Sequence, residues 1–168
     1  MKKMMMMIAA LAMTVAMQAQ SKFHDVEANH AKGPVKTMTV EDMMGQQVTN
    51  FSEDGKMQSR EMTDVVYDKD GYIQSAKVNA MGQSATAKFV WENGILSSRV
   101  IEVNGQSIKT KYVYDDNGVV TSEKIDLGEH EIEFPYSDYK FDDHGNWISR
   151  KASAMGREMI TTRSFIYY

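Results

Sequence analysis

Glycine recurs along this chain at nearly regular intervals, and this spacing limits the possible folds more than any other feature of the sequence. Glycine adopts positive φ without steric cost, and Asp and Asn side chains start tight turns by hydrogen bonding to nearby backbone. From Gly45 onward most intervals are ten to sixteen residues, which leaves room for one short strand between turns. The glycines that mark these turns are Gly45, Gly55, Gly71, Gly82, Gly94, Gly105, Gly118, Gly128, Gly145 and Gly156.

The turns belong to two alternating classes. In the acidic turns an aromatic residue leads, acidic or amide residues follow, and glycine and an apolar residue complete the segment, whereas the simple turns carry fewer acids. The acidic turns read FSEDGKM, YDKDGYI, WENGIL, YDDNGVV and FDDHGNW, and the simple turns read MMGQQ, NAMGQS, VNGQS, DLGEH and AMGRE. Asn-Gly, a strong hairpin signal, occurs at residues 93–94, 104–105 and 117–118. The sequence therefore predicts repeated hairpins.

The segments between turns show the period of two that is typical of β-strands. Ile108, Thr110, Tyr112 and Tyr114 alternate with residues of the opposite face. We expect an all-β fold, an antiparallel meander of about 10–12 short strands built from repeated hairpins. The interval between Gly55 and Gly71 lacks a turn glycine, so we expect a bend at residues 58–61, which read QSRE.

Aliphatic side chains are scarce. Leu, Ile, Val and Phe make up only about a fifth of the residues after position 20, and leucine occurs there only at Leu96 and Leu127. This is too little material for two thick packed layers. An elongated, twisted sheet or a half-open barrel fits the composition.

Residues 1–20 have the layout of a signal peptide. Lys2 and Lys3 precede an uncharged apolar run from Met4 to Ala16, which is shorter than the ~20 residues of a membrane-spanning helix. Cleavage is expected near Ala19 or Gln20, and the product is expected in the periplasm or outside the cell. We expect residues 21–32 to form a flexible N-terminal segment and residues 33–168 to form a single β domain.

The net charge and the absence of cysteine make several classes of function unlikely. The leader carries two lysines and no acids, so its removal changes the formal charge from −4 to −6. Nucleic acid is therefore not an expected partner, because its binding depends on clustered Lys and Arg. The chain has no cysteine, which excludes disulfides, a lipoprotein anchor and thiol catalysis. No later stretch is apolar enough for a membrane helix, and we do not expect the chain to span a membrane.

The acidic turns of VYDKDGYI, VYDDNGVV and KFDDHGNW resemble the tyrosine-aspartate (YD) repeats of RHS-type proteins, and more closely those of short exported proteins of bacterial envelopes. KGPVKTMTV resembles the first strand of such proteins, and GREMITTRSFIYY resembles their closing strand. The resemblance covers residues 33–168, with Phe51-Ser52 in place of Tyr-Asp in the first unit. It implies a β-repeat scaffold without an assigned activity.

Metal and catalytic chemistry find little support in the sequence. A helical calcium loop needs glycine at its sixth position, whereas glycine stands at the fourth position counted from Asp68. The four histidines lack metal-ligand spacing, and no G-x-S-x-G motif is present. Turn formation explains the acids and His144. We expect no catalytic residues, no metal and no cofactor.

Aromatic residues recur at comparable places on successive strands, where their rings can form a ladder across one face. Two interpretations stay open: the ladder is the core in place of leucine, or part of it is an open binding platform. The ring of Trp147, just after its turn, is expected to be partly exposed. The candidate binding residues are Trp91, Tyr114, Tyr139, Phe141 and Trp147.

These observations favour a protein that binds rather than catalyses. The leading hypothesis is a protein-interaction scaffold of the cell envelope, which contacts an envelope protein through an edge strand or the aromatic face. The alternative is a secreted glycan-binding module, and a small hydrolase is third.

Overall fold

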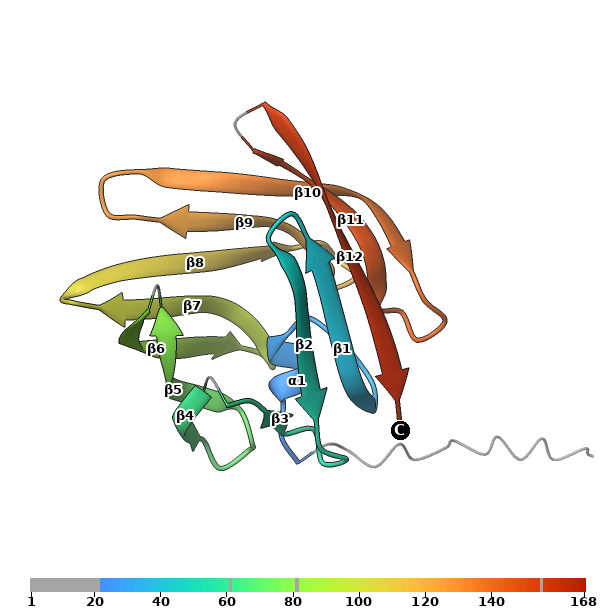
Figure 1. Cartoon of the computed structure of the whole chain (residues 1–168), viewed down its shortest axis with the longest axis horizontal. Helices are drawn as coiled ribbons and strands as arrows, with labels where there is room; N and C mark the ends of the chain where they lie inside the picture. Colours follow the sequence, from blue (N-terminus) through green and yellow to red (C-terminus); the bar gives the residue numbers. More distant parts are fainter. Residues whose placement is uncertain (1–21, 61, 81, 155) are drawn as a thin grey trace, which may run out of the picture.

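The computed structural model describes residues 22–60, 62–80, 82–154 and 156–168, and the predicted signal peptide lies outside them. Within these ranges one short helix and twelve antiparallel strands make up the fold (Figure 1). This confirms the expected all-β meander and its number of strands. The elements are α1 (Asp25–Ala28), β1 (Val35–Asp42), β2 (Gly45–Phe51), β3 (Met57–Gln58), β4 (Met62–Tyr67), β5 (Ile73–Ala80), β6 (Gln83–Glu92), β7 (Ile95–Val103), β8 (Gln106–Tyr114), β9 (Val120–Asp126), β10 (Glu131–Phe141), β11 (Trp147–Ala154) and β12 (Arg157–Tyr167).

All the strands form one sheet, in which the order of neighbours departs from the chain order at one point. Strands β4 to β12 are neighbours in sequence order, and β1, β2 and β3 extend the sheet beyond β12. β1 pairs with β12 through partners such as Met38 and Phe165. The two edge strands are therefore β3 and β4, which are consecutive in the chain. A bend at Arg60, within the range 58–61 where one is expected, lies between them.

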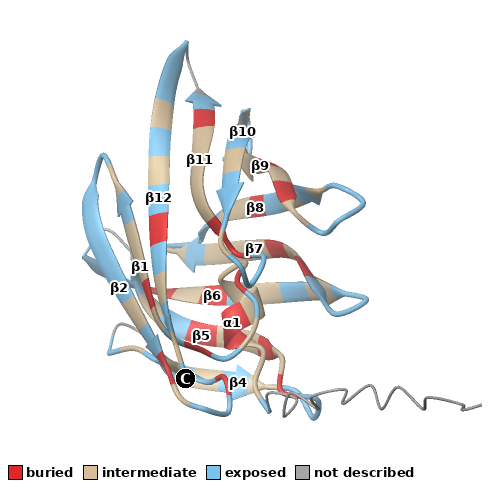
Figure 2. Ribbon diagram, turned by 90° about the vertical axis from the view of Figure 1, so that its right-hand side faces the viewer, coloured by how far each residue is buried: buried red, intermediate tan, exposed pale blue. Residues whose placement is uncertain are grey.

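The sheet is strongly curled but is not closed into a barrel. In Figure 1 β1, β2 and β12 run nearly vertically, and β7, β8 and β9 run nearly horizontally behind them. The side view in Figure 2 shows the same crossing. Such curling follows from the right-handed twist that accumulates over many strands. Of the two expected shapes, the structure has the half-open barrel.

Three of the acidic turns are held by their leading acid. The Asp142 carboxylate accepts hydrogen bonds from the backbone N–H groups of His144 (3.0 Å) and Asn146 (2.8 Å). Asp68 and Asp115 accept the equivalent pairs of hydrogen bonds in their own turns. Ser52 takes the same position in the first unit and accepts from the backbone N–H of Lys56. The interpretation of these acids as turn formers is confirmed.

Because an antiparallel meander reverses at every turn, the two turn classes lie at opposite ends of the strands. We call one of them the closed end, where the acidic turns contact the N-terminal segment (residues 22–34). We call the other the open end, which the simple turns form. At the closed end, the Lys32 backbone exchanges two hydrogen bonds with the Asn146 side chain (2.7 and 2.9 Å).

The N-terminal segment joins the two edges of the sheet. The backbone N–H of Phe23 donates to the carbonyl of Asp54 in the β2–β3 turn (3.0 Å), and that of His24 donates to Gly71 in the β4–β5 turn (3.1 Å). One Asp25 carboxylate oxygen accepts hydrogen bonds from the backbone N–H of Met57 on β3 and from the hydroxyl of Tyr67 on β4, both at 2.7 Å. One carboxylate therefore bridges both edge strands.

Asp25 is 1% exposed, and its second oxygen has no hydrogen-bond partner within the described part of the chain. Burial raises the pKa of Asp25 above its ordinary value, and the hydrogen bonds from Met57 and Tyr67 oppose that shift. The flexibility expected for residues 21–32 stays a prediction. Polar groups of the described residues 22–32 find partners on the assembled sheet.

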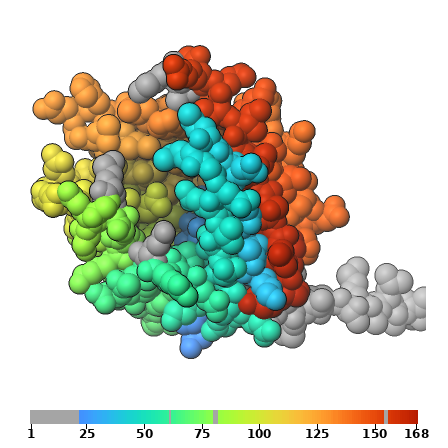
Figure 3. All heavy atoms as spheres, viewed as in Figure 1, coloured from blue at the N-terminus to red at the C-terminus, as the bar shows by residue number. Residues whose placement is uncertain are grey.

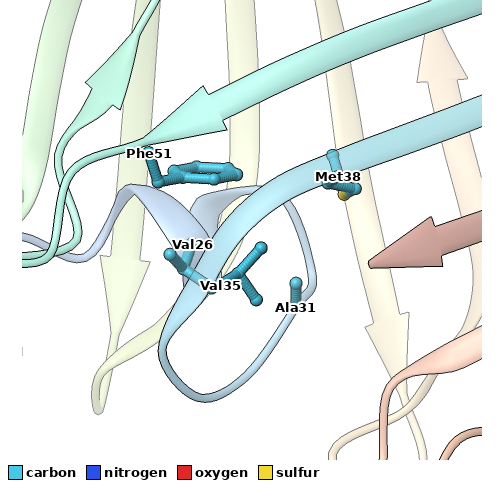
Figure 4. Close-up of a cluster of buried hydrophobic side chains, with 5 residues drawn as sticks. All are labelled: Val26, Ala31, Val35, Met38 and Phe51. Atoms are coloured by element: carbon cyan, nitrogen blue, oxygen red, sulfur yellow. The ribbon is translucent and has the colours of Figure 1, made fainter. Parts of the chain in front are cut away.

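The principal apolar cluster lies between the N-terminal segment and the sheet (Figure 4). Val26 of α1 and Ala31 pack against Val35 of β1 and Phe51 of β2, and each of the four is at most 2% exposed. Figure 2 shows buried positions in α1 and in parts of the strands around it. The core is thus small and depends on the N-terminal segment, as the scarcity of aliphatic residues suggests.

A substitution at Gly71 tests the packing of the N-terminal segment against the sheet. A Cβ at Gly71 would lie 1.9 Å from the backbone oxygen of Lys22, whereas a Cβ at Gly118, in the equivalent place of another acidic turn, would have no neighbour within 4 Å. Both glycines have positive φ (+89° and +75°), so Gly118→Ala should cost only the conformational penalty of about 1–2 kcal/mol. Gly71→Ala should lower the free energy of unfolding by at least about 2 kcal/mol more. Urea unfolding of both variants measures the difference, and equal losses would contradict the packing of the N-terminal segment.

Candidate functional site

A cavity opens inside the curled sheet, with the N-terminal segment as its floor. This inner cavity has a volume of about 390 Å³, within the range of small-molecule sites. Alternate residues of β1 and β7 to β12 line its wall, and Ala28, Asn29 and His30 form the floor. Figure 3 shows a recess beside β1 and β2 in which atoms of the N-terminal segment are visible. A neighbouring space of about 280 Å³ near the edge strands shares Arg99 with it.

The charged side chains that line the inner cavity are mostly arginines. Arg99 of β7, Arg150 of β11 and Arg163 of β12 face it, together with the acids Glu123 of β9 and Asp42 of β1. Asp42 lies at the end of its strand, where its carboxylate accepts the backbone N–H of Met44 (2.7 Å). Guanidinium groups therefore outnumber carboxylates around the cavity.

Arg163 fixes the N-terminal segment to the sheet. It is 7% exposed and donates hydrogen bonds to the carbonyls of Asn29 (2.9 Å), His30 (2.8 Å) and Trp147 (3.3 Å). Its guanidinium group also lies 3.6 Å from the centre of the Trp147 ring. Burial and the nearby charge of Arg150 lower the pKa of Arg163 to about 9. All three of its nitrogens have partners, so this arginine has a structural role.

Arg150 and Arg99 differ from Arg163, because some of their buried nitrogens lack partners. The guanidinium group of Arg150 lies over the rings of Tyr136 (3.5 Å) and Trp147 (4.3 Å), and its Nη2 is 3.7 Å from a Glu123 carboxylate oxygen. Nε and Nη1 of Arg150, and Nε of Arg99, are buried without a hydrogen-bond partner among the described residues. Buried donors in this state are energetically costly.

His30 reports the electrostatic environment of the cavity floor. Its ring packs edge-on against Tyr112, with ring centres 4.5 Å apart, and its Nδ1 is 3.4 Å from the Tyr114 hydroxyl. Burial lowers the pKa of His30 to about 3, and the charges of Arg150, Arg163 and Arg99 act in the same direction. His30 is therefore neutral at physiological pH, in a region of positive potential.

The structure brings together four of the five candidate binding residues. Tyr139 stacks on Phe141 (ring centres 5.7 Å apart) and contacts Trp147 edge-on (6.3 Å), and Tyr114, Phe141 and Trp147 border a small pocket of about 140 Å³ at the closed end. Trp91 lies elsewhere and packs against Tyr72 (4.9 Å). Phe141 is 45% exposed, and the other four rings are buried or partly buried. Their role in binding stays a prediction.

The expectation that Trp147 is partly exposed is wrong. The residue is 7% exposed, and the guanidinium groups of Arg150 and Arg163 both lie over its ring. Trp147 stands two residues after the turn glycine Gly145. The residues two places after Gly71, Gly94 and Gly118 are the buried Ile73, Leu96 and Val120. This repeated position is a sequence signal from which the burial of Trp147 could have been predicted.

Aromatic residues at the start of the acidic turns, or two residues before it in the case of Tyr139, link neighbouring units. The Trp91 ring N–H donates to the carbonyl of Ile73 (2.8 Å), the Tyr114 hydroxyl donates to Leu96 (2.6 Å), and the Tyr139 hydroxyl donates to Val120. In the last unit Arg163 makes the equivalent bond to Trp147. The ladder is thus a structural feature of the repeat.

Sequence reasoning did not identify the arginines as candidate site residues. Arg99, Arg150 and Arg163 stand on different strands and share no local motif. Only the curl of the sheet brings them to one cavity. Among the residues that the structure describes, no group of three or more His, Cys, Asp or Glu side chains is placed to hold a metal ion.

The comparisons with known proteins identify no relative. No family model matches the chain, and no curated protein sequence is similar to it. Within the described ranges, no helix has both the length and the apolar character to cross a membrane.

The low pKa of His30 predicts how the stability of the protein depends on pH. Below its ordinary pKa of 6.5 the histidine gains a proton in the unfolded chain but not in the folded protein until the pH reaches about 3, so acid destabilises the fold. His30→Asn removes this titration, and asparagine tolerates the positive φ of 53° at this position. Between pH 6.5 and 4.5 the wild type should lose about 2 kcal/mol more unfolding free energy than the variant. Urea unfolding at both pH values measures this, and parallel losses would show that His30 is protonated in the folded protein.

Proposed function

We propose that this chain is an exported, non-catalytic binding protein that holds a small molecule in its inner cavity. The observation that carries the proposal is the cavity of about 390 Å³, which has a floor of ordered backbone and walls from seven strands. Clefts of this size with a few polar groups among apolar side chains are typical of ligand sites.

The charged groups of the cavity favour binding over catalysis. Three of them are arginines, which hold a positive charge at neutral pH and seldom transfer protons. His30, the histidine of the floor, is kept neutral by its surroundings. Binding without chemistry is the simplest use of such groups.

The proposal of export to the periplasm or the medium depends on the signal-peptide layout of residues 1–20. The proposed kinship with short exported YD-repeat proteins depends on the acidic turns. Its support is that Asp68, Asp115 and Asp142 hold three of these turns by the same hydrogen bonds.

A protein-interaction scaffold of the envelope is the second candidate. It is favoured by apolar side chains near the open end, where Met43 and Met44 are 77% and 87% exposed and Val48 on β2 is 56% exposed. An envelope protein could cover them. The glycan-binding alternative has less support, because arginine side chains cover the ring of Trp147.

Adjacent residues of β12 provide a matched test of the cavity proposal. Thr161 lines the inner cavity, whereas Thr162 is exposed on the outer face of the same strand. Thr161→Trp should fill the cavity and abolish binding, and Thr162→Trp should bind as the wild type does. A set of small carboxylates, sugars, amino acids and nucleosides, screened by the shift in melting temperature and by calorimetry, provides the measurement.

Binding of any compound from the set to the wild type and to Thr162→Trp, but not to a folded Thr161→Trp variant, supports the proposal. If no compound binds the wild type, or if the filled variant binds equally well, the cavity is not the binding site.

A further inference from the structure

We propose that the inner cavity binds a small organic carboxylate with an apolar or aromatic body, and that Arg150 and Arg99 are the residues that hold its anionic group. This inference rests on the proposed function, because it names the ligand class of the same cavity. It is carried by two arginines that line the cavity and that have buried guanidinium nitrogens without a hydrogen-bond partner among the described residues.

The unpaired donors are the first argument. Arg163 shows how this fold satisfies a buried guanidinium group, with three nitrogens bonded to three backbone carbonyls. Among the residues that the structure describes, Arg150 and Arg99 have no such bonds at three nitrogens, and the side chain of Arg150 is only 11% exposed. Desolvating a charged donor costs several kcal/mol unless a partner replaces the water. Both side chains line the cavity, and an anion there would compensate their charge by charge-assisted hydrogen bonds.

The charge balance is the second argument. Three arginines and two acids line the cavity, so its formal charge is +1. Both acids are already engaged, Asp42 by a backbone N–H in its own turn and Glu123 by Arg150. Arg150 and Arg99 line the same cavity as Tyr112 and His30. One negative charge would neutralise the site.

The apolar wall is the third argument, and it favours a carboxylate over free phosphate. Met38, Met159 and Phe134 line the cavity beside the partly buried rings of Tyr112 and Tyr136. A strongly hydrated dianion gains nothing from such a wall, whereas a ring or an aliphatic chain does. Carboxylate geometry also suits guanidinium groups.

Titrations of the wild-type protein with four probes separate the contribution of the carboxylate to the affinity from that of the apolar body. We expect benzoate to bind, benzyl alcohol and acetate to bind at least about tenfold more weakly, and inorganic phosphate to bind no better than acetate. Calorimetry gives the affinities. In parallel, ¹H–¹⁵N spectra of the arginine Nε–H groups should show shifts at Arg150 and Arg99 with benzoate.

Substitutions of single arginines test which residues hold the carboxylate. Arg150→Met and Arg99→Met should each weaken benzoate binding about tenfold or more, and Arg157→Met is the matched control. Arg157 is exposed at the start of β12 and does not line the cavity, so its variant should bind benzoate as the wild type does. A merely structural role of Arg150 or Arg99 would change stability without changing the ratio of benzoate to benzyl alcohol affinity.

Several results would overturn this inference. They are equal binding of benzoate and benzyl alcohol, tighter binding of phosphate than of benzoate, unshifted Nε–H signals of both arginines, or equal losses in all three arginine variants. A neutral compound that binds the wild type and is excluded by Thr161→Trp would overturn the carboxylate assignment and leave the proposed function intact. Failure of every compound to bind would overturn both.

Discussion

The buried carboxylate of Asp25 is the interaction on which the shape of this protein depends. A curled sheet with two free edges has nothing in its own strands to hold those edges at a fixed separation, and here one oxygen accepts hydrogen bonds from both edge strands. The surrounding segment supplies Val26 and Ala31 to the core and the floor of the inner cavity. The same segment therefore connects the two edges of the sheet, completes the core and forms the floor of the cavity.

The features that could be predicted from the sequence are those that depend on interactions between residues close together in the chain. The acidic turns, the alternation of the strands and the bend near residue 60 depend on neighbours within a few residues, and all three appear as expected. The packing of Asp25 against Met57 and Tyr67 depends on partners more than thirty residues away. The cavity is harder still to predict, since Arg99, Arg150 and Arg163 meet only after a sheet of many strands has curled.

The repeat also explains how an unusual site can arise within a regular scaffold. In three units an aromatic side chain donates a hydrogen bond to the carbonyl two residues after a turn glycine, and in the last unit Arg163 takes that place. Because Arg163 has a guanidinium group where the other units have an aromatic ring, it also donates two hydrogen bonds to the N-terminal segment. A variation at one structural position thereby contributes to the positive potential of the cavity.

The pairing of β1 with β12 has a consequence for the order of assembly. The first strand of the sheet can find its neighbour only after the last strand exists, so β1 to β3 remain unpaired with the rest of the sheet throughout synthesis. Pairing between such distant segments carries a high loop-closure entropy and slows folding. In a chain with this topology the sheet remains incomplete until the C-terminal strand is available to pair with β1.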